Sequence, residues 1–188
     1  MPIYAIADLH LSYGIPAKPM NVFGDNWNNY ENEIMKNWNN VVKPDDLVIL
    51  PGDFSWATYI QDTVKDFEYL ARLQGKKLLL KGNHDYWWTT IASMNKFLKD
   101  NNFTNIDFLF NSAYEHENNI IVGTRGWTFN DTENSEKMLK REINRLELSI
   151  KNGILKYGSD KKIICAMHYP PITKTMIKNN ISSPYIEL

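Results

Sequence analysis

Short runs of apolar and β-branched residues recur along the chain, separated by polar segments. Bounded apolar runs of about four to eight residues are typical of strands that are buried on both faces. Five strands are predicted in this way, at residues 3–7, 47–50, 77–80, 120–122 and 163–166. Residues 107–123 differ, because two β-like runs flank the sequence EHENN. This pattern predicts a hairpin, with His116 in an exposed turn.

Helical spacing of apolar residues fills several of the segments between these runs. Stripes of this kind run from Trp27 to Val41, from Ile60 to Leu73 and from Ile91 to Leu98. A charged segment later in the chain carries an apolar face made of Leu139, Ile143, Leu146 and Ile150. Such stripes are most often the core-facing sides of helices. Alternation of strands and helices predicts an α/β layered fold.

Composition and charge narrow the range of partners and compartments. The chain has 188 residues and a net charge of −1, so one domain is expected, with no general attraction to nucleic acid or anionic membranes. The N-terminus lacks a basic leader, and no apolar run approaches the roughly 20 residues of a membrane span, so no membrane partner is predicted. The single Cys165 excludes an internal disulfide and fits a reducing, cytoplasmic location; we expect it to be buried in its strand.

Polar residues follow four of the predicted strands directly. In α/β sheets the carboxyl ends of the strands are where ligand sites form. Gly52 and Gly82 permit a tight turn just before two of these polar groups. The groups are Asp8 and His10 after the first run, Asp53 after the second, Asn83 and His84 after the third, and His168 after the last.

The chemistry of these side chains indicates a metal site. Asp8 and Asp53 offer carboxylates, His10 and His168 offer imidazoles, and Asn83 offers an amide oxygen. A mixed oxygen and nitrogen set suits Mn, Fe, Co or Zn better than Ca, and the absence of thiolates argues against an Fe–S cluster. Two such ions, about 3.5–4 Å apart, form the arrangement that clamps the attacking and leaving oxygens in phosphoryl transfer. Taken singly, each motif could be an ordinary turn or surface residue; their conjunction, each after a strand, favours the metal site.

At this point the sequence resembles the calcineurin-like metallophosphoesterases. That family has the motifs D-x-H, GD, GNH[DE] and H in this order, followed by GHxH. The first four match Asp8 and His10, Gly52-Asp53, the tetrapeptide 82–85 and His168, and the match runs from residue 3 to about 171. The resemblance implies an α/β fold, a β-sandwich of two mixed sheets flanked by helices, formed by a single domain over residues 1–188.

The resemblance also implies a role for each matching residue. Asp8 and His10 would hold one divalent ion, and Asn83 and His168 a second. Asp53 would bridge the two ions, which would be Mn²⁺, Fe or Zn²⁺. His84 would protonate the leaving group of a phosphoester, a role that suits a side chain titrating near neutrality. The adjacent Asp85 is assigned to the catalytic group with it.

Two departures from the family pattern affect the expected activity. The second motif continues as GDFSWAT and not as GDxxDRG, which makes phosphoprotein substrates less favoured. The final GHxH is absent, since the chain has only His10, His84, His116 and His168. The last residues, SSPYIEL, resemble the start of a helix, so we expect that a C-terminal stretch is missing. Two alternatives to a phosphoester hydrolase therefore remain: a non-catalytic phosphate- or nucleotide-binding protein, or an inactive fragment.

The sequence says less about the substrate than about the metal. Arg125, in GTRGW, is a candidate for phosphate binding together with Asn83, although a structural salt bridge would equally explain it. Aromatic residues could stack on a base or sugar or could belong to the core; they are Tyr86, Trp87, Trp88 and Trp127. The expected partner is a small-molecule or nucleotide phosphoester. Nucleic acid is not indicated, and an uncovered surface at the C-terminal end would favour a homo-oligomer.

Overall fold

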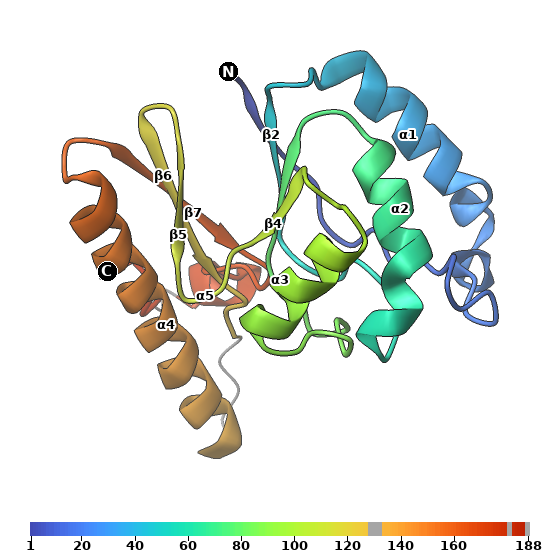
Figure 1. Ribbon diagram of the computed structural model, residues 1–188. Helices are drawn as coiled ribbons and strands as arrows, with labels where there is room; N and C mark the ends of the chain where they lie inside the picture. The colour runs from blue at the N-terminus through green and yellow to red at the C-terminus, as the bar shows by residue number, and fades with distance from the viewer. Residues whose placement is uncertain (128–132, 180–181, 187–188) are drawn as a thin grey trace. The chain divides into compact units, whose positions relative to one another are not determined.

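The computed structural model describes residues 1–127, 133–179 and 182–186, and the chain divides into two compact units. Unit 1 comprises Met1–Phe108 and unit 2 comprises Leu109–Leu188. Each unit contains one β-sheet with accompanying helices, so the predicted α/β class with two sheets and flanking helices is confirmed (Figure 1). The single domain over residues 1–188 stays a prediction.

The sheet of unit 1 has four strands in the order β1-β2-β3-β4. Every pairing between them is parallel, so mixed pairing is found in the sheet of unit 2 and not here. Parallel neighbours require crossover connections, and helices provide them. The strands are β1 (Ile3–Ala5), β2 (Leu47–Leu50), β3 (Lys76–Leu79) and β4 (Ile106–Phe108).

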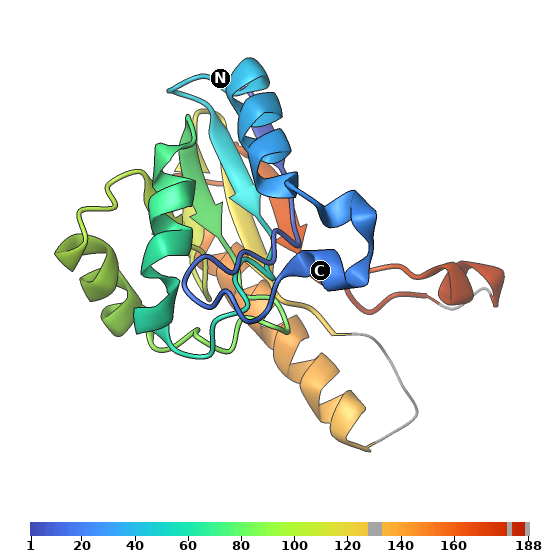
Figure 2. The same cartoon turned by 90° about the vertical axis from the view of Figure 1, so that its right-hand side faces the viewer.

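Three α-helices make the crossovers of unit 1. Because the strand order follows the chain order, right-handed crossovers place all three helices on the same side of the sheet, as Figures 1 and 2 show. They are α1 (Tyr30–Val41), α2 (Val64–Arg72) and α3 (Ile91–Asp100). Three 3-10 helices lie between these elements: η1 (Met20–Phe23), η2 (Asp25–Trp27) and η3 (Ile60–Thr63).

Aromatic rings fill the space between this sheet and its helices. Phe67 of α2 is fully buried and packs against Phe54 with 4.8 Å between ring centroids and against Trp87 at 5.5 Å. Trp87 is itself fully buried and Trp88 nearly so, which shows that both belong to the core. Burying each such side chain contributes about 1.5–3 kcal/mol. The loops that carry Asp53 and His84 are thus anchored by their own neighbours, Phe54 and Trp87.

Unit 2 is built on a hairpin and one long helix. β5 (Ala113–His116) pairs antiparallel with β6 (Asn119–Thr124), and β6 pairs in parallel with β7 (Lys162–Met167). The crossover is α4 (Glu133–Tyr157), followed later by the short α5 (Lys174–Lys178). Leu139 and Leu146 of α4 pack with Ile120 and Val122 of β6, as the predicted apolar face requires. Gly153 allows the close approach, because a Cβ there would lie 2.7 Å from Ile120 Cγ2.

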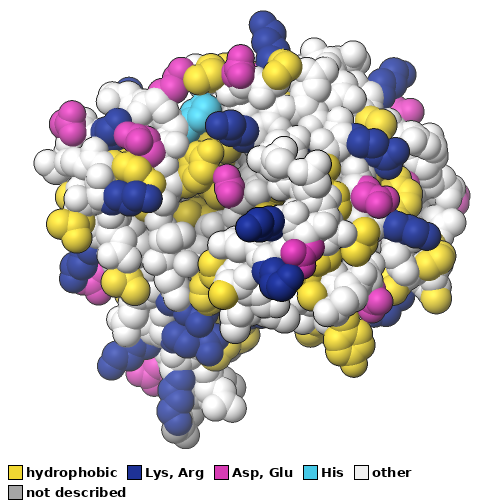
Figure 3. All heavy atoms as spheres, viewed as in Figure 1, with side chains coloured by type: hydrophobic (Ala, Val, Ile, Leu, Met, Phe, Trp, Pro, Cys, Tyr) yellow, Lys and Arg dark blue, Asp and Glu magenta, His cyan; other side chains and the backbone are white. Residues whose placement is uncertain are grey.

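The outer face of α4 is strongly basic. A surface hollow of about 420 Å³ is lined by Lys137, Lys140, Arg141, Asn144, Arg145 and Leu148, and Lys and Arg side chains gather over this part of the helix in Figure 3. Among the described residues, no helix has both the length and the apolar character that crossing a bilayer demands.

Two single-residue predictions are wrong. His116 is not an exposed turn residue, since it ends β5 and is 7% exposed; the turn consists of the next two residues. Cys165 lies on β7 as predicted, but its side chain is exposed. In both cases the secondary structure was predicted correctly from the local sequence. Which side chains of the strand are exposed depends on packing within unit 2.

Candidate metal centre

Three loops leave the same edge of the unit 1 sheet. They follow β1, β2 and β3, which run in parallel, so their carboxyl ends lie together. The first two loops continue the pairing of their strands: the Asp8 N–H donates to the Gly52 carbonyl at 3.1 Å, and the His10 N–H donates to the Asp53 carbonyl at 3.0 Å. Backbone hydrogen bonds therefore bring together two motifs that are more than 40 residues apart in the sequence.

Asp8, His10 and Asp53 form a compact group of potential metal ligands. One ligand atom from each lies within 4.8 Å of the other two. His10 Nε2 is 3.8 Å from an Asp8 carboxylate oxygen and 3.7 Å from an Asp53 carboxylate oxygen. The Asp8 side chain is 55% exposed and that of Asp53 only 3%, so the group opens to solvent on the Asp8 side. Two carboxylates and one imidazole at this spacing fit a divalent transition-metal ion.

The same three residues share an unusual backbone conformation. Their φ angles are positive, at 58° for Asp8, 45° for His10 and 53° for Asp53. A non-glycine residue held in this left-handed region costs of order 1–3 kcal/mol, and such residues cluster at functional sites. Seven non-glycine residues of the described chain have a positive φ, and three of them are the side chains that converge here. This coincidence supports a binding role for the group.

The GNHD loop closes the group from the third strand. The His84 N–H donates to Asp53 Oδ1 at 2.8 Å, so one oxygen of that carboxylate is fixed. Gly82 makes this approach possible, because a Cβ at position 82 would lie only 2.0 Å from the same oxygen. Asn83 is half-buried between these two residues. The glycine of this motif is therefore required by the position of Asp53.

Asp85 lies behind the loops and holds them to one another. Its buried carboxylate accepts hydrogen bonds from the N–H groups of Gly82 at 2.7 Å, Asp53 at 2.9 Å and Phe54 at 2.9 Å. The indole N–H of Trp87 adds a bond at 3.0 Å. Burial raises the pKa of Asp85 above its ordinary value, while the backbone donors act in the opposite direction. The sequence analysis grouped Asp85 with the catalytic residues. In the structure its hydrogen bonds stabilise the loops that carry Asp53 and Gly82.

His84 points its ring toward the same group. Its centroid is 5.7 Å from that of His10, in an edge-to-face arrangement, and the side chain is half-buried. It is not part of the Asp8, His10 and Asp53 group, so a role other than metal binding remains open to it. Its predicted role as a proton donor stays a prediction.

Sequence reasoning missed two aromatic neighbours of His10. The Trp56 ring stacks on the imidazole with 4.5 Å between centroids, and the Tyr30 hydroxyl donates to the His10 carbonyl at 3.0 Å. Trp56 lies three residues after Asp53, so proximity to the GD motif was the only available signal. Tyr30, at the start of α1, gave none.

Unit 2 places Arg125 and His168 at one edge of its own sheet. Thr124 pairs with Met167 at the ends of β6 and β7, so Arg125 and His168 are the residues that follow. Arg125 lies 4.0 Å from the buried Glu142, and its guanidinium stands over the Trp127 ring at 4.8 Å. These contacts explain Arg125 structurally; its contact with substrate and the metal-binding role of His168 stay predictions.

A family profile and a curated protein match this chain. A sequence profile described as calcineurin-like phosphoesterase matches residues 1–185. The chain is 34% identical over 83 residues to the uncharacterized protein MJ1445 of Methanocaldococcus jannaschii, covering 44% of this chain and 46% of that protein. It therefore spans about half the length of that curated relative.

Two solved structures are also similar to this chain. One is a protein of unknown function, AQ665, from Aquifex aeolicus, with 24% identity, a TM-score of 0.45, and coverage of 95% of this chain and 98% of the other. The second is the phosphopantetheinyl hydrolase PptH from Mycobacterium tuberculosis, with 13% identity, a TM-score of 0.47, and coverage of 93% and 70%.

Proposed function

The chain belongs to the calcineurin-like phosphoesterase family, and from this premise we propose that it hydrolyses phosphoesters with divalent metal ions held at Asp8, His10 and Asp53. The observation that carries the proposal is the convergence of these three side chains, each with a strained backbone, at one edge of a parallel sheet. When bound there, a divalent cation supplies positive charge for the phosphoryl oxygens and lowers the pKa of water.

Three side chains of this protein have distinct proposed roles in metal binding, proton donation and support of the loops. Asp53 is buried and fixed by the His84 N–H, so its carboxylate is pre-positioned for binding. His84 is proposed as the proton donor to the leaving oxygen, because an imidazole near neutrality can both hold and release that proton. Asp85 keeps the second and third loops in register through its backbone hydrogen bonds.

A second ion is proposed from the family resemblance, with Asn83 and His168 as its ligands and Asp53 bridging. Mn²⁺, Fe or Zn²⁺ suit such a mixed oxygen and nitrogen set. Arg125 and Asn83 are the proposed contacts to the substrate phosphate. The number of ions bound by the wild type and by His168→Ala, determined by elemental analysis of the dialysed protein, tests this assignment: the variant should bind one ion fewer.

The hydrolase proposal is tested with a panel of phosphomonoesters and phosphodiesters in the presence of millimolar Mn²⁺ and after treatment with EDTA. Turnover should require the metal and should be lost in Asp53→Asn, which keeps the side-chain volume and an acceptor for the His84 N–H. The matched control is Asp45→Asn, at an exposed carboxylate just before β2 and hence at the opposite end of that strand. Phosphate binding without turnover of any panel member would instead favour a non-catalytic phosphate-binding protein.

A further inference from the structure

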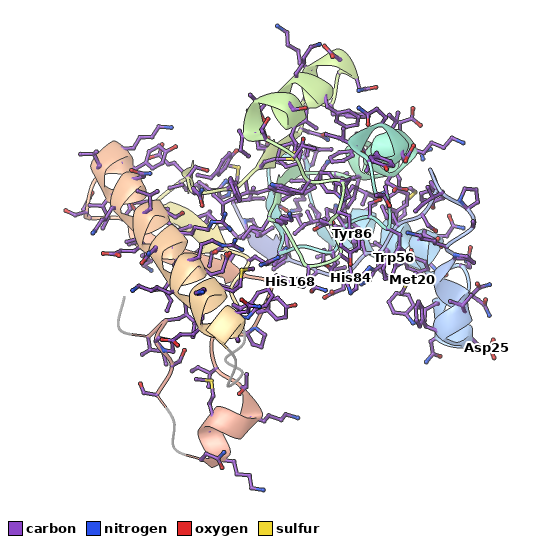
Figure 4. The ribbon with its side chains drawn as sticks, turned by 90° about the horizontal axis from the view of Figure 1, so that it is seen from below. Met20, Asp25, Trp56, His84, Tyr86 and His168 are labelled. Atoms are coloured by element: carbon purple, nitrogen blue, oxygen red, sulfur yellow. The ribbon has the colours of Figure 1, made fainter. Side chains whose placement is uncertain are left out.

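Aromatic rings border the candidate site of unit 1 on the side of His84. Trp56 contacts both histidines: its ring centroid is 4.5 Å from that of His10, nearly parallel at 22°, and 5.0 Å from that of His84. The indole is held in place from the other end, since its N–H lies 3.0 Å from the sulfur of the buried Met20. Figure 4 shows Met20, Trp56 and His84 in one group. Trp56 is thus a fixed wall beside the proposed proton donor.

Two further rings extend this wall into solvent. Phe23 lies nearly parallel to Trp56, with 6.5 Å between centroids and 18° between ring planes. Tyr86 stands edge-on to His84 at 6.2 Å and lies beside it in Figure 4. Phe23 is 67% exposed and Tyr86 61% exposed, so both rings are accessible from solvent. Trp56 packs against His10, whereas Phe23 lies beside Trp56 and Tyr86 beside His84, both open to solvent.

We propose that Phe23, Trp56 and Tyr86 form a subsite for a planar aromatic ring carried by the leaving group of the substrate, and that this ring is a nucleobase. The inference rests on the proposed function, because it takes His84 as the residue that protonates the leaving group. The aromatic wall adjoins His84 and therefore lies where that group must extend. The exposed rings of Phe23 and Tyr86 each offer a face on which a flat ring can stack, and stacking on aromatic side chains accepts any base.

Binding of an uncleavable analogue tests the subsite without relying on turnover. The probes are the methylenephosphonate analogues of adenosine 5′-monophosphate and of ribose 5-phosphate, in which CH₂ replaces the ester oxygen, titrated by calorimetry in the presence of Mn²⁺. The two ligands share the phosphonate and the sugar and differ only in the base. Stacking should make the adenosine compound bind about tenfold more tightly to the wild type.

Single substitutions then test which side chains produce the preference for the adenosine analogue. Phe23→Ala and Tyr86→Ala should each reduce the preference for the adenosine compound about threefold or more while leaving the affinity for the ribose compound unchanged. Phe23→Leu separates a planar subsite from a merely apolar one, since it keeps an apolar side chain but removes the flat face; it should behave like Phe23→Ala. Val41→Ala, an exposed apolar position at the end of α1 just before the strand that leads to Asp53, is the control and should change neither affinity.

Equal affinity of the wild type for the two analogues would overturn the subsite, as would equal losses for both analogues in Phe23→Ala. A Phe23→Leu variant with wild-type preference would also contradict a planar subsite. These outcomes are separate from the proposed function: hydrolysis of adenosine 5′-monophosphate and ribose 5-phosphate with equal kcat/KM would contradict the subsite and leave the hydrolase proposal intact. If no phosphoester is hydrolysed but binding still depends on the base, the hydrolase proposal is contradicted and the subsite proposal stands.

Discussion

Asp85 anchors Asp53 through the backbone: an oxygen of the buried Asp85 carboxylate accepts the Asp53 N–H at 2.9 Å, and the same oxygen accepts the Gly82 N–H at 2.7 Å. The last residue of the GNHD motif therefore fixes the GD motif, 32 positions earlier in the chain. The two motifs form one hydrogen-bonded unit, so a substitution in either motif should disturb the conformation of both.

Replacing Asp85 by Asn should destabilise the protein. The amide offers one acceptor oxygen in place of two, and its NH₂ group would face backbone N–H donors in a site that excludes water. A loss of about 2–4 kcal/mol in the free energy of unfolding is expected, measured by urea denaturation. Asp100→Asn, at an exposed carboxylate paired with Lys96 on α3, should change stability by less than about 0.5–1 kcal/mol. A loss no larger than that of the control would show that the hydrogen bonds of Asp85 contribute little.

Gly82→Ala should damage the metal centre more directly. The new methyl group would lie 2.0 Å from Asp53 Oδ1, so the carboxylate or the loop must move. We expect Mn²⁺ affinity to fall at least tenfold, because displacement of a ligand by even about 1 Å is costly. Gly158→Ala, which meets only the flexible Asp160 side chain in unit 2, is the control for a strained glycine site. Unchanged Mn²⁺ affinity in Gly82→Ala would mean that Asp53 is not held as described.

His84→Ala should reduce turnover while leaving metal affinity close to that of the wild type. General acid catalysis contributes about 10²–10⁴-fold, and the loss should shrink for esters such as p-nitrophenyl phosphate, whose leaving groups need no proton. The ratio of kcat between wild type and variant, compared across alkyl and nitrophenyl esters, measures this. If the variant loses its metal and regains full turnover when metal is restored, His84 is a ligand and not the acid.

Lys77 predicts a pH dependence of stability. This lysine of β3 is buried, its ammonium donates to the carbonyls of Leu73 and Gly75, and burial lowers its pKa to about 7. The unfolded chain, with an ordinary lysine pKa near 10.4, binds more protons than the folded protein above pH 7. The free energy of unfolding should therefore rise with pH, by about 2 kcal/mol between pH 7 and pH 9. Urea denaturation of wild type and Lys77→Met at both values should show this rise only in the wild type; a rise of equal size in the variant would contradict the assignment.

Much of the fold was predictable because local sequence determines it. β2 occupies the predicted residues, and β3 and β7 differ from the predictions by about one residue at each end, since bounded aliphatic runs leave few alternatives. The predicted β-like segment 107–123 begins within β4, but β4 pairs with β3, and it is β5 that forms the hairpin with β6. η1 and α5 were not predicted, because four or five residues give too short a pattern, whereas η3 falls at the start of the predicted helical stripe from Ile60 to Leu73.

The candidate site was predictable in its residues but not in its supports. Asp8, His10 and Asp53 follow strands that turned out to be parallel neighbours, so the expectation of a shared edge is met within unit 1. The left-handed backbone at these residues depends on hydrogen bonds between loops, which no single segment encodes. The stacking of Phe23 on Trp56 joins segments 33 positions apart. Contacts of this kind follow from the tertiary fold and leave no local pattern in the sequence.

Direct measurement of metal binding tests the central claim, that Asp8, His10 and Asp53 form a metal centre. Mn²⁺ is titrated into metal-free protein and free Mn²⁺ is followed by its electron paramagnetic resonance signal, for wild type, Asp53→Asn and the control Asp45→Asn. The account predicts saturable binding to wild type and control, and an affinity at least tenfold lower for Asp53→Asn, because a fixed, charged ligand is lost. Equal Mn²⁺ affinity in all three proteins, or no saturable binding to the wild type, would contradict it.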